Sequence, residues 1–165
     1  PSISRQNLVV GILAVYLAIQ ILVPFRHFLY PGDASWSEEG HLFAWRMKLR
    51  EKRGRIEFFI KNPADGTVLK HDPKEYVPAW QLRVMSFSPD LIHQYAFYLA
   101  EQMRAEGKPN VEVRVRCAQS LNGRRPAWLI DPEVDLAAQP RNWKPAPWIL
   151  PLEEPLVRQT AERLD

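Results

Sequence analysis

The chain lacks most of the features that mark small catalytic or metal-binding proteins. Its 165 residues include one cysteine, so an internal disulfide and a cysteine-based metal site are both excluded. The four histidines form no i,i+4 pair of the kind found in helical zinc sites, and there is neither a glycine-rich phosphate loop nor a G-x-S-x-G motif. The net charge of +3 is small, and aromatic residues do not interleave with the basic ones, so nucleic acid is not expected as a partner.

Acidic residues are absent from the first 32 positions, where Arg5 and Arg26 are the only charged residues. The other 20 basic residues and all 19 acidic ones lie in residues 33–165. Residues 8–25 carry no charge, and as a helix they would span about 27 Å, close to the roughly 30 Å hydrocarbon core of a bilayer. We therefore predict that residues 1–32 form a transmembrane helix and its exit loop.

Two alternatives to the transmembrane helix stay open. A buried core helix would usually show a polar stripe, and a signal peptide would need small residues at its cleavage site. The first residue is Pro1 and not methionine, which indicates a processed product, an expression form or a fragment. Gln20 in the apolar run favours a neighbouring helix as its partner, so we expect further helices upstream. Arg5 and Arg26 flank opposite ends, so charge does not set the orientation.

Residues 33–138 have the pattern of an α+β domain built from antiparallel β-hairpins and one main helix. Period-two alternation or β-rich composition predicts strands at 45–50, 55–61, 67–70 and 111–117, with a return strand at about 126–130. Ser88 as N-cap and Pro89 as first helical residue predict the start of the main helix, which Gly107 ends. The stretch around 72–78 is expected to be irregular.

Turn signals join these elements. Lys52-Arg53-Gly54 and residues 63–66 are interpreted as turns, and Asn122-Gly123 is a strong hairpin signal. Residues 139–165 are rich in proline and are predicted to form an extended strap and C-terminal tail. We expect four apolar side chains to pin the strap to the domain: Trp143, Trp148, Ile149 and Leu152.

A basic run before the second predicted strand has a structural and a functional interpretation. Residues 46–55 hold six basic residues and one acidic residue. The favoured interpretation is the solvated face of a hairpin, with Lys48, Lys52 and Lys61 exposed to water, and the alternative is contact with anionic lipid headgroups. Cys117 lies on the apolar side of a strand and is expected to be a core thiol.

Three acidic residues fall within the five positions from Asp131 to Asp135. They are too few for a calcium or magnesium site, so a capped turn is preferred, with Asp131 before Pro132 starting a short helix. No metal site is expected.

Four sequence blocks together resemble a known family. They are residues 25–32, 36–47, 120–124 and 129–136, with residues 89–96 fitting between them. Their order and spacing resemble the vitamin K-dependent gamma-carboxylases and their bacterial relatives with a horizontally transferred transmembrane (HTTM) domain, over about residues 8–150.

The resemblance implies an integral membrane protein in which the last membrane helix is followed by a lumenal or periplasmic domain. Upstream membrane helices, the lipid bilayer and a Glu-containing peptide are the implied partners. The family's reaction carboxylates glutamate side chains, using vitamin K hydroquinone or another quinol, O2 and CO2. The family's catalytic lysine lies upstream, so no catalytic residue is expected here, and this chain alone is expected to bind none of these cofactors and to be inactive. The full-length protein would be a lyase.

The block after the helix supplies the candidate site residues, which either help to close the active-site mouth or dock the domain onto the membrane helices: Trp36, Glu38, Glu39, Gly40, His41 and Trp45. The later blocks supply structural motif residues: Asn122, Gly123, Arg124, Asp131, Pro132 and Asp135. The alternative function is a non-catalytic, membrane-anchored binding domain for a secreted protein or a lipid.

Overall fold

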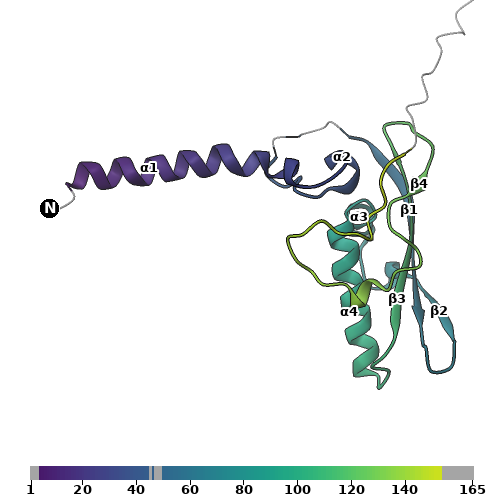
Figure 1. The fold of residues 1–165 in the computed structure, drawn as a ribbon. Coiled ribbons are helices and arrows are strands. Elements are labelled where there is room, and N and C mark those ends of the chain that lie inside the picture. Colours follow the sequence, from purple (N-terminus) through teal and green to yellow (C-terminus); the bar gives the residue numbers. More distant parts are fainter. Residues whose placement is uncertain (1–3, 45, 47–49, 154–165) are drawn as a thin grey trace, which may run out of the picture.

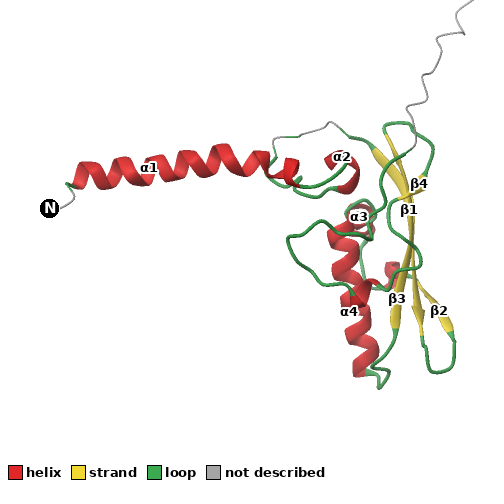
Figure 2. Ribbon diagram, in the orientation of Figure 1, coloured by secondary structure: helices red, strands yellow, loops and turns green. Residues whose placement is uncertain are grey.

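The computed structural model of the chain describes residues 4–44, 46 and 50–153 (Figure 1). A long helix extends from an α+β body, in which a four-stranded antiparallel sheet of order β2-β1-β3-β4 lies beside helix α4 (Figure 2). The predicted α+β class with an apolar N-terminal helix is therefore confirmed. With η for 3-10 helices, the elements are α1 (Arg5–Leu22), η1 (Val23–Leu29), α2 (Ala34–Ser37), β1 (Lys52–Lys61), β2 (Val68–His71), η2 (Pro73–Glu75), α3 (Ala79–Met85), α4 (Pro89–Ala105), β3 (Glu112–Leu121), β4 (Ala127–Trp128) and η3 (Leu136–Ala138).

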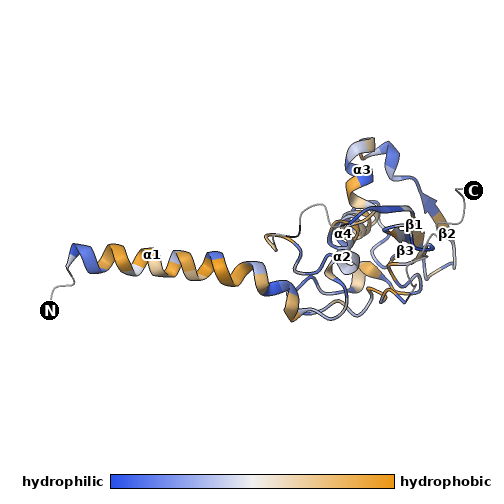
Figure 3. Cartoon of the chain, turned by 90° about the horizontal axis from the view of Figure 1, so that it is seen from above, coloured by the Kyte–Doolittle hydropathy of each residue, from blue (hydrophilic) through white to orange (hydrophobic). Residues whose placement is uncertain are grey.

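Helix α1 is mostly apolar beyond its polar first turn (Figure 3), and none of its residues is buried. Ser4 caps it, since its hydroxyl accepts a hydrogen bond from the Asn7 amide at 3.3 Å. The helical span Arg5–Leu29 is long and apolar enough to cross a membrane, a property that signal sequences share. The α-helix gives way to η1 next to Pro24, which cannot donate a backbone hydrogen bond.

The core lies between the sheet and α4. Inward-facing residues alternate along β3, so that Val113, Val115 and Cys117 have no exposed surface. Ile92 and Ala96 of α4 are also fully buried in the same cluster. The prediction of a core thiol is confirmed, and burial raises the pKa of Cys117 to about 11.

Strand β1 begins earlier than the sequence predicts. The predicted turn at Lys52-Arg53-Gly54 is wrong, because these residues pair with the end of β3. A Cβ at position 54 would lie 2.1 Å from the carbonyl oxygen of Ala118, so Gly54 permits a close strand approach and marks no turn. The predicted strand at 45–50 falls largely outside the described residues, and its described members, Arg46 and Arg50, lie in no strand.

The helical segment before β3 contains one element that the sequence did not reveal. Helix α4 follows its prediction, but Ser88 occupies the N-cap position without a side-chain capping bond. Helix α3 was not predicted. It has only seven residues, fewer than the window of roughly 11–18 over which apolar periodicity indicates a helix.

The proline-rich strap runs back along the domain. The Trp148 carbonyl accepts from the Asp131 amide at 3.0 Å, and the Leu150 amide donates to the Leu129 carbonyl at 3.0 Å. Trp148 is 5% exposed, as expected for a residue that pins the strap. The same prediction for Trp143 is wrong, because that side chain is 83% exposed.

The acidic segment near the strap forms capped turns. Asp131 accepts from the Glu133 amide at 2.9 Å, and Pro132 lies inside this turn. The short helix that follows begins later than predicted, because Asp135 caps η3 through the Ala137 amide at 3.0 Å. Asp135 also accepts from the Val113 amide at 2.8 Å, which ties the turn to β3.

The hairpin turn after β3 has the geometry that its sequence predicts. Asn122 and Gly123 have φ values of 50° and 77°. The Asn122 side chain accepts from the Glu51 amide at 2.7 Å, and the Arg124 amide donates to the Leu121 carbonyl at 3.1 Å. The turn thus also fixes the residue that precedes β1.

We expect Gly123→Ala to lower the free energy of unfolding by about 1 kcal/mol, because an L side chain disfavours positive φ and no neighbouring atom offers a compensating contact. Gly123→Asn should cost less, since asparagine tolerates this conformation. Denaturant unfolding measures both. Equal stability of the alanine variant and the original chain would contradict the turn assignment.

Candidate functional site

A buried ion pair joins the segment after the apolar helix to strand β1. The ammonium group of Lys52 lies 2.9 Å from Glu38 Oε1, and the two side chains are 2% and 12% exposed. Lys52 Nζ also donates to the Trp36 carbonyl and, at 3.2 Å, to the Phe87 carbonyl. Its three acceptors come from α2, the turn after α2 and the α3–α4 connection, so one side chain holds three segments together.

The second oxygen of the Glu38 carboxylate binds another cation. Arg50 Nη2 lies 2.7 Å from Glu38 Oε2, and Arg50 also contacts His41 Nε2. Glu38 has the left-handed backbone conformation, with φ of 62°, which ends α2 and turns the chain toward β1. The carboxylate therefore lies between Lys52, the first residue of β1, and Arg50, two residues before it.

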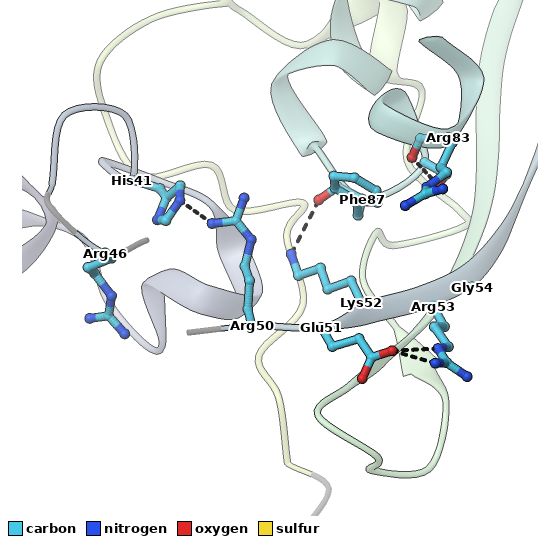
Figure 4. Close-up of a pocket in the computed structure, with 10 residues that line it drawn as sticks. His41, Arg46, Arg50, Glu51, Lys52, Arg53, Gly54, Arg83 and Phe87 are labelled. Atoms are coloured by element: carbon cyan, nitrogen blue, oxygen red, sulfur yellow. Dashed lines mark hydrogen bonds and ion pairs between the residues drawn. The ribbon is translucent and has the colours of Figure 1, made fainter. Parts of the chain in front are cut away.

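A basic pocket of about 1100 Å³ opens beside this ion pair (Figure 4). Its lining includes five basic side chains and a single acidic one, Glu51. The basic residues are Arg46, Arg50, Lys52, Arg53 and Arg83, and the other lining residues are His41, Gly54, Ser86 and Phe87. Glu51 is paired with Arg53 at the solvent-exposed edge. Positive charge thus predominates in the lining of the pocket.

Two buried nitrogen atoms among the pocket residues lack a hydrogen-bond partner. His41 Nδ1 and Arg46 Nε have no hydrogen-bond partner among the described atoms. Arg50 donates to His41 Nε2, so the proton of a neutral ring lies on Nδ1, and both nitrogens are donors. Buried donors are normally satisfied, so an acceptor from a bound ligand fits this place.

Burial and the neighbouring charges shift three pKa values at the site. Burial lowers the pKa of Lys52 and raises that of Glu38, while their mutual attraction opposes both shifts. Burial and the charges of Arg50 and Arg46 lower the pKa of His41 below its usual range. The imidazole is therefore neutral at pH 7, and the arginines carry the positive charge that faces the pocket.

The remaining candidates from the same block serve to join parts of the domain. Trp36 is 2% exposed, and its indole N–H donates to the Leu150 carbonyl at 2.7 Å. Glu39 accepts from the Ala146 amide at 2.8 Å. A Cβ on Gly40 would lie 2.6 Å from the Cα of His27, so glycine permits the contact between this turn and η1. Trp45 lies outside the described residues.

The structure changes the interpretation of the basic run. Lys52, which the sequence assigned to a solvated hairpin face, is buried, and Arg50 is also largely enclosed, with 22% of its side chain exposed. Alternation along the chain cannot reveal this, because the acceptors of Lys52 are supplied by segments 14, 16 and 35 residues away. Arg83 was also missed, since it lies on the unpredicted helix α3. No group of three or more potential metal ligands occurs among the residues that the structure describes.

These features define an α+β domain with a basic pocket, carried on a helix that could cross a membrane. A family model described as the lumenal domain of vitamin K-dependent gamma-carboxylase matches residues 5–155, so the chain belongs to this family. The resemblance drawn from the four sequence blocks is confirmed. Membership and the apolar helix fit a membrane protein with a lumenal domain. No solved structure matches the chain.

We expect Lys52→Met to lower the free energy of unfolding by about 3 kcal/mol, because it leaves buried acceptors without a donor. Arg53→Met is the matched control, since its pair with Glu51 is exposed (82% and 64% of the two side chains) and should contribute at most about 1 kcal/mol. Denaturant unfolding of both variants measures the difference. Equal losses would contradict the structural role of Lys52.

Proposed function

We propose that the chain is the lumenal part of a gamma-carboxylase-like membrane protein and that its basic pocket receives the acidic side chain of a peptide substrate. The pocket is the observation that carries this proposal. Its cations come from the segment after the apolar helix, the start of β1 and helix α3. A glutamate carboxylate carries one negative charge and its carboxylated product carries two, so positive charge at this place suits both.

Arg83 is the basic residue of the pocket that is best placed to bind a ligand. Among the described residues it forms no ion pair, whereas Arg50 and Lys52 are already bound to Glu38. Arg83 can therefore bind a carboxylate without breaking an ion pair, at the end of the pocket opposite His41 and Arg46 (Figure 4). The buried ion pair would then shape the pocket, and Arg83 would contact the substrate.

In the proposed reaction, the full-length protein replaces a γ-hydrogen of glutamate with CO2, driven by oxygenation of a quinol such as vitamin K hydroquinone. The described pocket does not suit a prenylated quinol, because its lining is mostly charged and Phe87 is its one large apolar residue. We therefore assign the quinol and the reacting groups to the membrane part of the full-length protein. This chain would supply substrate positioning from the lumenal side.

Incorporation of labelled CO2 into a Glu-containing peptide tests the proposal in the full-length protein that carries this chain. We expect quinol-dependent incorporation. Arg83→Gln should raise KM for the peptide about fivefold, equivalent to roughly 1 kcal/mol, with little change in kcat. The exposed Arg55, which lies on β1 and is not among the pocket residues, provides the matched control Arg55→Gln.

The outcomes separate the two parts of the proposal. Absence of incorporation with several quinols and peptides would contradict the carboxylase function and leave a non-catalytic binding domain as the better account. Incorporation with equal KM values for Arg83→Gln and Arg55→Gln would contradict the assignment of the pocket to substrate binding.

A further inference from the structure

The most exposed large apolar side chains of the described residues gather where the apolar helix meets the domain. They belong to three segments: the end of η1, the loop after Gly40 and the proline-rich strap. We call these five residues the exit collar: Trp143 (83% exposed), Leu29 (79%), Phe43 (74%), Phe28 (73%) and Leu42 (69%). Soluble proteins seldom present such side chains together unless they contact another apolar phase.

Specific contacts hold the two loops against η1. The Tyr30 hydroxyl donates to the Trp143 carbonyl at 3.0 Å, across 113 positions of the chain. Arg26 Nε donates to the Gly40 carbonyl at 3.4 Å, and the Arg26 guanidinium carbon lies 6.0 Å from the centre of the Phe43 ring. The collar is therefore a fixed surface around the end of the helix.

The backbone at Phe43 adds an independent observation. The Ala44 amide donates to the His41 carbonyl at 3.1 Å and closes a turn in which Phe43 has a φ of 63°. Glycine or asparagine is favoured at the third position of such a turn, and a bulky residue there is strained. The turn itself gives no reason for an aromatic residue. Phe43 lies beside the Arg26 guanidinium and is still 74% exposed, so most of its apolar surface has no contact among the described residues.

The dimensions place the collar at the edge of a bilayer. The 18 residues of α1 extend about 27 Å, and the seven residues of η1 add at most about 14 Å. Their sum of about 41 Å exceeds the roughly 30 Å hydrocarbon core and reaches the headgroup region. A helix that starts at one face of the core would thus end among the headgroups of the other.

The charges beside the collar also suit a lipid surface. Residues 23–30, 40–44 and 142–145 contain Arg26 and Lys144 and no acidic residue. Tryptophan and tyrosine favour the boundary between headgroups and acyl chains, and basic residues favour anionic headgroups. Two of the three segments combine both properties, with Tyr30 and Arg26 in the first and Trp143 and Lys144 in the last.

We propose that the exit collar inserts into the headgroup–acyl boundary of the bilayer that α1 crosses. The helix alone would leave the domain free to tilt about one point. Insertion of two loops beside it supplies three points of contact and fixes the face that the domain turns toward the membrane.

Site-directed spin labelling of this chain in phosphatidylcholine–phosphatidylglycerol vesicles tests the proposal. Nitroxides are attached to Phe43→Cys and Trp143→Cys, and power saturation compares their accessibility to O2, which partitions into lipid, with that to a water-soluble nickel complex. Leu69→Cys is the matched control, since Leu69 is 56% exposed on β2 and belongs to none of the collar segments. Native Cys117 is fully buried, and labelling of the unmodified chain measures its reactivity.

We expect the ratio of O2 to nickel accessibility to be several-fold higher at positions 43 and 143 than at position 69. A water-like ratio at both collar positions would overturn the proposal. Low accessibility to both reagents at the collar would also overturn it, because it would mean that protein, such as a second copy of the chain, covers these residues.

Discussion

The arrangement of the whole chain depends on the buried contact between Lys52 and Glu38. Removing two charges from water is costly, and the contact is maintained because both partners find further hydrogen-bonding groups. Lys52 uses all three of its donors, and Glu38 binds Arg50 with its other oxygen. Through this contact the short segment that follows the apolar helix becomes part of the domain core.

The segment after the apolar helix contacts η1 on one side and lines the basic pocket on the other. On one side, Gly40 lies against η1, and the exit collar faces away from the domain. On the other side, His41 and Arg50 line the basic pocket. In our proposals the first face meets the bilayer and the second meets an acidic substrate. The same short segment would then connect the membrane face to the pocket.

Local signals predicted those parts of the fold that depend on neighbours in sequence. The apolar helix, the β3 alternation, the start of α4 at Pro89 and the turn at Asn122-Gly123 all follow from short-range chemistry. Family resemblance directed attention to the block around Glu38. The role of Lys52 could not be predicted, because its partners are brought to it by the tertiary fold, and Trp143 was misjudged because a tryptophan in a strap usually packs inward.

The central claim is that the Lys52–Glu38 contact fixes the helix end on the domain. A pulsed electron spin resonance distance between nitroxides at Leu22→Cys on α1 and Glu101→Cys on α4 tests it directly, since both sites are exposed. We predict one narrow distance distribution in the otherwise unmodified chain and a broad one when Lys52→Met is added, while added Arg53→Met leaves it narrow. An equally narrow distribution in a folded Lys52→Met protein would contradict the account.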